Sequence, residues 1–247
     1  MASADHRGST EWRVLKFGGT SVSSLANWRN IAATVRERSD DGSPVLIVHS
    51  ALSGVTDLLE RAFTAAIHQG ASADLLAVRE RHLSLALDLG LREIPSFEAQ
   101  FSSLRSRLEV IAERGAPTAR DRAAVIAYGE LLATALGEAY LRAQGLPAVW
   151  LDAREVLRAV RREAATEQAA YLSATCEFRP DPALRARLCA LGSVVVTQGF
   201  IAGDAAGDTV LLGRGGSDTS AAYFAAILQA RELEIWTDVP GMFSANP

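Results

Sequence analysis

The chain has 247 residues, of which 49% are apolar and 22% charged, with a formal net charge of −4 at pH 7. It is long enough to bury a substantial core. Its net negative charge argues against a nucleic-acid partner, which would require a basic surface. Residues 1–11 are polar and predict a flexible tail instead of a signal or membrane segment, followed by one domain over residues 12–247. We therefore expect a cytoplasmic globular protein that binds neither nucleic acid nor membrane.

Short runs of β-branched and aromatic residues alternate with stretches of helical periodicity. Strands are predicted at 14–17, 45–49, 148–151, 193–197 and 233–237. Helices are predicted at 26–38, 55–69, 72–114, 119–143, 182–190 and 219–230, and a hairpin joins 200–202 to 209–212. This order predicts an α/β fold, a three-layer αβα sandwich with a mostly parallel central sheet.

A glycine turn follows the first predicted strand. Lys16 stands where this strand meets Gly18 and Gly19, and a helix is predicted to begin soon afterwards. Strand, glycine turn and helix form a phosphate-binding arrangement, because backbone amides and the positive end of the helix attract an anion. Lys16 would then reach the phosphate oxygens. The alternative is a surface lysine beside a structural turn.

A second glycine-rich turn, at residues 213–218, leads into an apolar helix. Its glycines would let a ligand approach the backbone, and Arg214 offers a planar fork that can grip a carboxylate through two hydrogen bonds. The alternative is a tight turn with a helix N-cap. Neither turn matches the P-loop or the dinucleotide fingerprint, since Asp218 stands where the latter has its last glycine.

We predict no catalytic or metal-binding role for the two cysteines or for His49. Cys176 and Cys189 belong to no Cys/His cluster with metal-ligand spacing, so both are predicted to be core residues, and no metal site is predicted. His49 ends a predicted strand, which favours packing over acid–base chemistry.

Six motifs, in order, resemble aspartate kinase, a member of the amino acid kinase family, and they extend over nearly the whole chain. They are K-F-G-G-T-S-V at 16–22, H-S-A-L-S-G-V-T-D at 49–57, Y-G-E-L-L at 128–132, T-Q-G-F-I at 197–201, G-R-G-G-S-D-T-S-A at 213–221 and W-T-D-V-P-G at 236–241. The resemblance also implies that the helices over about 72–143 form an insertion in the kinase domain.

The resemblance implies phosphorylation of the side-chain carboxylate of aspartate by Mg-ATP, with Mg²⁺ held mainly through the ATP phosphates. A carboxylate nucleophile is already ionised at neutral pH, so no general base is needed. The catalytic residues would be Lys16, which stabilises the transferring phosphate, and Asp218, which orients that lysine. Aspartate would be bound by Ser50, Thr56, Glu130, Phe200, Arg214 and Ser217. The nucleotide would be bound by Lys16, Gly18, Gly19, Gly215, Gly216, Thr237, Asp238 and Phe243.

Charge dictates two of these roles. Aspartate carries an ammonium and two carboxylates, so a selective site needs a cation for the α-carboxylate and an anion for the amine. The resemblance gives these roles to Arg214 and Glu130. Thr56 could instead cap the helix that follows it.

The last segment departs from the family pattern G-I-Y-T-x-D-P-R, because Phe243 replaces a tyrosine and Asn246 an aspartate. The family's arginine, later lysine segment and regulatory ACT domains would follow Pro247, so a kinase domain incomplete at its C-terminus is expected. Two alternatives are therefore kept: an inactive fragment that binds aspartate or a partner, and another family member acting on acetylglutamate, glutamate or UMP. A homo-oligomer and fusion to diaminopimelate decarboxylase are expected of the intact enzyme from the resemblance alone.

Overall fold

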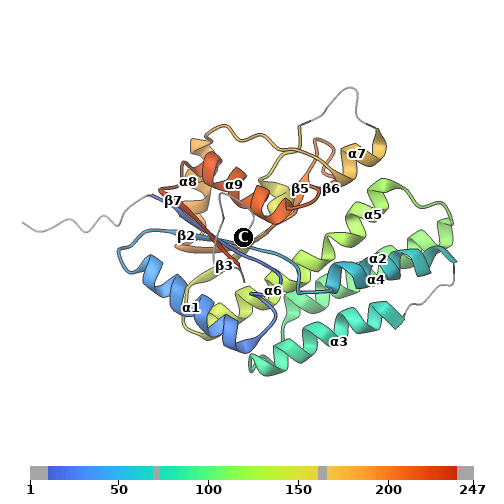
Figure 1. Cartoon of the computed structure of the whole chain (residues 1–247), viewed down its shortest axis with the longest axis horizontal. Coiled ribbons are helices and arrows are strands. Elements are labelled where there is room, and N and C mark those ends of the chain that lie inside the picture. The colour runs from blue at the N-terminus through green and yellow to red at the C-terminus, as the bar shows by residue number, and fades with distance from the viewer. Residues whose placement is uncertain (1–10, 69–72, 161–165, 238–247) are drawn as a thin grey trace, which may run out of the picture.

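Five parallel strands form the centre of the protein. We describe it from a computed structural model, which places residues 11–68, 73–160 and 166–237. The strands are β1 (Arg13–Phe17), β2 (Val45–His49), β3 (Ala148–Leu151), β4 (Val194–Gln198) and β7 (Glu232–Trp236), in the order β3-β4-β2-β1-β7 (Figure 1). All five predicted strands are confirmed within about one residue. The nearly continuous apolar runs of β2 and β4, which are buried throughout, suit parallel strands that are covered on both faces.

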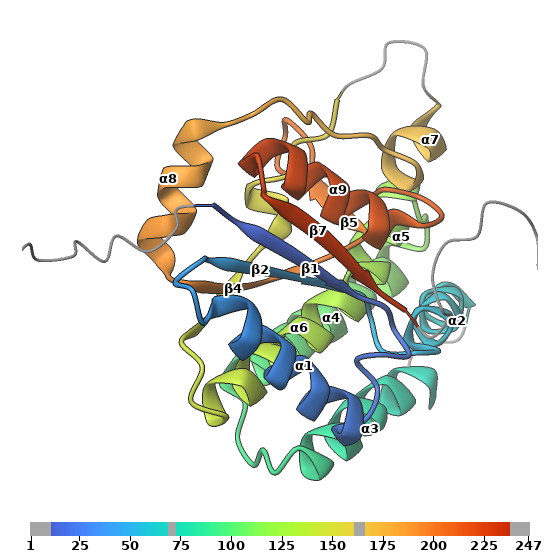
Figure 2. The ribbon, with the colours of Figure 1, turned by 60° about the vertical axis from the view of Figure 1, so that its left-hand side comes forward.

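Helices cover both faces of the sheet. On one face lie α1 (Leu25–Ser39) and α6 (Tyr128–Ala143), and on the other lie α8 (Pro182–Leu191) and α9 (Gly216–Leu228) (Figure 2). The three-layer αβα sandwich is thus confirmed. The stretch Ala119–Ala143 is long and apolar enough to cross a membrane, but 89% of its apolar window is buried inside this fold. Burial of that kind is what a core helix shows.

The predicted helical insertion gathers to one side of the sheet (Figure 1). It contains α3 (Ala73–Asp88), α4 (Pro95–Arg114) and α5 (Ala119–Ile126), which pack with α2 (Val55–His68) and α6. The region 72–114 is two helices, since Gly90 adopts a left-handed φ of 74° and Pro95 starts α4. Although α6 follows directly from α5, it packs on β3 and β4 and so belongs to the sandwich.

The predicted hairpin is confirmed as a separate two-stranded antiparallel sheet of β5 (Ile201–Gly203) and β6 (Thr209–Leu211). A 3-10 turn, η1 (Ala153–Glu155), and a short helix, α7 (Glu167–Leu172), were not expected. Both are too short to show a helical period in the sequence.

Three local expectations are wrong. The last helix begins at Gly216 instead of Thr219, because Gly215 takes a left-handed conformation and serves as its N-cap. Thr56 does not cap α2, which already begins at Val55. Cys176 is buried as expected, but Cys189 lies on the exposed side of α8.

The register of the sheet aligns the carboxyl ends of its strands. Phe17 of β1 is paired with His49 of β2 on one side and with Trp236 of β7 on the other, and His49 is paired with Gln198 of β4. The loops that leave these strands therefore start at one edge. In parallel α/β sheets ligands bind at this edge.

Candidate active site

Lys16 and Asp218 meet at this edge. Lys16 lies near the end of β1 and is only 7% exposed, whereas Asp218 lies in the first turn of α9. The Nζ atom of Lys16 is 2.7 Å from Oδ1 of Asp218. The ion pair thus joins the two glycine turns that the sequence singled out.

Lys16 is also the only lysine among the 247 residues, and the other side chains that count as cations in the net charge are all arginine. An ammonium is a compact point charge, whereas a guanidinium is a wide planar fork. This composition was a signal for Lys16 that our sequence reasoning missed. The single lysine of the chain is the residue whose ammonium pairs with Asp218.

The first glycine turn packs tightly against the loop that follows β2. A Cβ atom added to Gly19 would lie 2.9 Å from the carbonyl oxygen of Ala51, which is closer than such atoms approach. A Cβ atom added to Gly18 would lie 3.5 Å from Nζ of Lys16, an ordinary contact. Gly19 is therefore required by close packing, and Gly18 leaves the backbone beside Lys16 uncovered.

The second glycine turn holds Phe200 beside the start of α9. Phe200 has a left-handed φ of 67°, and its amide donates to Oγ of Ser220 at 2.8 Å. A Cβ atom on Gly216 would lie 2.6 Å from the Phe200 ring, and one on Gly199 would lie 2.6 Å from Cβ of Ser217. Phe200 and Ser217 are consequently fixed against the same turn as Asp218.

Glu130 contributes a buried carboxyl group below the loop that follows β2. It lies in the first turn of α6, is 3% exposed and accepts a hydrogen bond at Oε1 from the amide of Ala51 at 3.2 Å. Its Oε2 atom has no partner among the described residues. Burial raises the pKa of Glu130 to about 8, because the charged form loses its hydration. A ligand cation would restore the charged form.

A buried polar network, which our sequence reasoning missed, anchors α6 beneath Glu130. Oγ1 of Thr134 donates to the Glu130 carbonyl and accepts from Nε2 of Gln198 at 2.8 Å and from Nε1 of Trp150 at 2.9 Å. Oε1 of Gln198 in turn accepts from the amide of Ala153. The network joins α6 to β3 and β4, and although Gln198 belongs to the T-Q-G-F-I motif, the sequence did not indicate its partners.

His49 is a packing residue, as the sequence indicated. Its ring is fully buried, lies edge-on to Trp28 at 5.6 Å and hydrogen-bonds the Ser50 carbonyl through Nδ1 at 3.0 Å. Burial lowers its pKa to about 4, so the ring is neutral at physiological pH. Its hydrogen bond fixes the first residue of the loop after β2.

The other predicted site residues are distributed as follows. Ser50 and Thr56 are half-buried in the loop after β2 and the first turn of α2, and Arg214 and Gly215 are exposed in the second glycine turn. Thr237 is exposed directly after β7. Asp238 and Phe243 lie outside the described residues.

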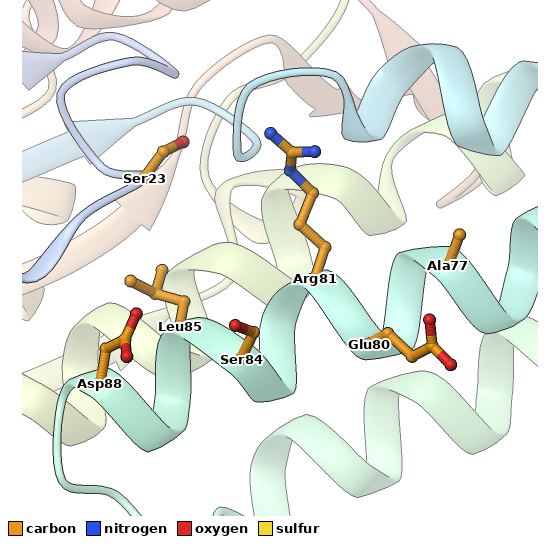
Figure 3. A pocket seen from close by; sticks show the side chains of 7 residues that line it. All are labelled: Ser23, Ala77, Glu80, Arg81, Ser84, Leu85 and Asp88. Atoms are coloured by element: carbon orange, nitrogen blue, oxygen red, sulfur yellow. The ribbon is translucent and has the colours of Figure 1, made fainter.

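A groove of about 460 Å³ runs along α3, beside the loop that leads into α1 (Figure 3). Its lining includes neither Lys16 nor Asp218. The lining residues are Ser23, Ala77, Glu80, Arg81, Ser84, Leu85 and Asp88.

Fold and site together define an α/β protein in which charged groups and two glycine turns lie at the carboxyl ends of the strands of a parallel sheet. The chain belongs to the amino acid kinase family, whose model matches residues 11–247. It is 33% identical over 241 residues to an aspartokinase of Chlamydia muridarum, covering 95% of this chain and 49% of that protein. It is 34% identical to the lysine-sensitive aspartokinase 3 of Escherichia coli, covering 95% and 50%.

The structure is similar to that of E. coli aspartokinase III in complex with aspartate and ADP. The TM-score is 0.71 at 32% identity, and the match covers 94% of this chain and 50% of that one. The chain therefore spans about half the length of the aspartokinases it matches.

Proposed function

We propose that this chain is the kinase domain of an aspartokinase, which transfers the γ-phosphoryl group of ATP to the side-chain carboxylate of L-aspartate. The observation that carries the proposal is the Lys16–Asp218 ion pair between two glycine turns, with the partly unpaired carboxyl of Glu130 buried nearby. The similarity to an aspartokinase that binds aspartate and ADP supports it. The product would be 4-phospho-L-aspartate, the first intermediate towards lysine, threonine and methionine.

The reaction needs no proton transfer. An oxygen of the aspartate side chain attacks the γ-phosphorus, the bond from phosphorus to the β,γ-bridging oxygen breaks, and ADP leaves with that electron pair. Lys16 neutralises charge on the transferring group, and Asp218 holds the ammonium in place. The amides of Gly18, Gly19, Gly215 and Gly216 would bind phosphate oxygens.

Aspartate is proposed to bind between the loop after β2 and the start of α9. Glu130 would pair with its ammonium, because Oε2 lacks a partner in the described structure and the buried carboxylate gains from a cation. Arg214 would bind the α-carboxylate. The remaining proposed contacts are those of Ser50, Thr56, Phe200 and Ser217.

The nucleotide is proposed to lie beside the end of β7, against Thr237, Asp238 and Phe243. The described residues contain no group of three or more His, Cys, Asp or Glu side chains that could hold a metal ion. We propose, from the similarity to aspartokinases, that Mg²⁺ arrives on the ATP phosphates, where it neutralises their charge. The homo-oligomer and the decarboxylase fusion stay predictions.

The test is ADP formation from Mg-ATP, with hydroxylamine trapping the acyl phosphate, on this chain and on a version extended past Pro247. Aspartate should support turnover, while acetylglutamate, glutamate and UMP should not. Activity in the longer version alone would identify this chain as a binding-competent fragment. Turnover with another acceptor, or none in either version, would contradict the proposal.

A further inference from the structure

The hydroxyl group of Ser23 joins the two loops at the sheet edge, in addition to the packing of Gly19 against Ala51 and the hydrogen bond from the Ser50 amide to the Phe17 carbonyl. Ser23 follows the first glycine turn, and its Oγ donates to the carbonyl oxygen of Gly19 at 2.6 Å. The Oγ atom of Ser23 also accepts a hydrogen bond from the amide of Ser53, in the loop after β2, at 3.0 Å. A single side chain therefore uses both hydrogen-bonding capacities of its hydroxyl to join two loops.

The surroundings make this joint rigid on one side. The amide of Val22 donates to the carbonyl of Gly18 at 3.2 Å, and Nδ2 of Asn27 donates to the carbonyl of Thr20 at 3.0 Å. Ser24 then caps α1. The first glycine turn is thus closed by its own backbone hydrogen bond and tied to α1 through the side chain of Asn27. The hydrogen bond to Ser23 connects the amide of Ser53 to this rigid unit.

We propose that Ser23 is a positioning residue for phosphoryl transfer, which sets the distance between the phosphate-binding turn and the aspartate-binding loop. This inference rests on the proposed function. In that function the amides of Gly18 and Gly19 hold the phosphoryl group, and the loop from Ser50 to Thr56 holds the acceptor. In-line transfer depends on their separation, and a displacement of about 1 Å can cost about a hundredfold in rate.

Ser23 does not act by contacting the reacting groups. It lines the groove along α3, across from Arg81 (Figure 3), and the lining of that groove includes neither Lys16 nor Asp218. Its effect should therefore appear in turnover more than in the affinity for either substrate.

The groove also provides a matched pair of variants. Because Ser23 borders about 460 Å³ of open space, an added methyl group has room. Ser23→Thr keeps the hydroxyl, whereas Ser23→Val has nearly the same shape and lacks it. The difference between these variants isolates the two hydrogen bonds from the change in volume.

In the kinase assay we expect kcat of Ser23→Val to be at least tenfold below that of Ser23→Thr, with the KM values for aspartate and ATP within about threefold of each other. A purely structural role would reduce the amount of folded enzyme and the melting temperature without this split between kcat and KM. Equal kcat values in the two variants, whether high or low, would overturn the proposal.

A second measurement does not need turnover. Amide hydrogen exchange at Ser53, followed by NMR on the 247-residue chain, should be at least tenfold faster in Ser23→Val than in Ser23→Thr, because only threonine retains the acceptor oxygen. Equal exchange rates would show that the hydroxyl does not hold the loop and would overturn the inference. Inactivity of the wild-type chain with aspartate would instead count against the proposed function, and the exchange result would still decide the role of Ser23.

Discussion

The ammonium of Lys16 and the carboxylate of Asp218 lie 2.7 Å apart, although about two hundred residues separate them in the chain. Lys16 is nearly buried, whereas the side chain of Asp218 is 52% exposed. The ion pair therefore holds the Lys16 ammonium at the carboxyl end of the sheet, between the two glycine turns. Because Lys16 is the only lysine in the sequence, its chemistry can be followed without interference from other lysines.

Replacing Lys16 should chiefly lower turnover, because its charge matters most while the phosphoryl group is in transfer. We expect Lys16→Ala to reduce kcat by two or more orders of magnitude, and Lys16→Arg to restore little of it, since a guanidinium does not fit the nearly buried site. Arg214→Ala is the matched comparison and should chiefly raise KM for aspartate. Steady-state kinetics distinguish the two patterns, and full turnover in Lys16→Ala would refute the assignment.

Asp218 should fix the position of the Lys16 ammonium. With ¹³C-labelled lysine the protein gives a single side-chain Cε resonance, which we expect to shift in Asp218→Asn and on addition of ATP. Asp204→Asn, in the turn between β5 and β6, is the control and should leave the resonance unchanged. A resonance insensitive to both ATP and Asp218→Asn would argue that the ion pair is absent in solution.

The two glycines of the first turn should differ in their tolerance of alanine. Gly19→Ala places a methyl group 2.9 Å from the Ala51 carbonyl oxygen, so the loops must separate, and we expect a loss of about 1–3 kcal/mol in unfolding free energy and a large fall in kcat. Gly18→Ala meets an ordinary contact and should cost less than about 1 kcal/mol. Denaturant unfolding and kcat measure both effects. Equal effects of the two substitutions would be inconsistent with the packing described.

Glu130 should make the ligand-free protein less stable as the pH rises. Its pKa is about 8 when folded and near 4.5 when unfolded, so the folded state binds more protons between these values and loses stability with increasing pH. Glu130→Gln removes this contribution. Its stability relative to wild type should therefore increase by up to roughly 1.4 kcal/mol per pH unit across this window. Glu113→Gln, exposed on α4, is the control.

The same carboxyl group should report aspartate binding. If the ligand ammonium pairs with Glu130, the carboxyl ionises and binding near pH 7 releases up to one proton. Calorimetric titrations in buffers of different ionisation enthalpy measure that number. Binding without proton release would place the ammonium elsewhere.

His82 should make the protein less stable as the pH falls into the acidic range, which is the opposite pH dependence to that of Glu130. It is buried in α3 beside Phe97, its Nδ1 bonds the Val78 carbonyl, and burial lowers its pKa to about 4. Its contribution to stability is complete above about pH 6.5 and is lost as the pH falls towards 4. His82→Phe should lose less stability than wild type between pH 7 and 5, by roughly 1 kcal/mol per pH unit at most. An exposed control, His68→Asn, should follow wild type in the same denaturant titrations.

Much of the fold was predictable because parallel strands and amphipathic helices leave periodic signals. The β1 and β2 runs and the glycine turns at 18–19 and 213–216 were found from local sequence alone. The sequence-based predictions were wrong where the local structure or burial depends on a tertiary contact. The start of α9 depends on the left-handed conformation of Gly215, and Cys189 faces solvent because α8 packs through Leu184 and Leu188.

The sequence by itself determined which groups are available: a single lysine near the end of a strand, two glycine turns, and a glutamate in the first turn of a largely apolar helix. Their chemistry follows from residue type and neighbours along the chain. Only the tertiary structure decided that Lys16 pairs with Asp218, that Glu130 keeps one oxygen without a partner in the described residues, and that Ser23 joins Gly19 to Ser53. These relationships depend on strand order, register and burial, which arise from packing between distant segments and leave no local pattern.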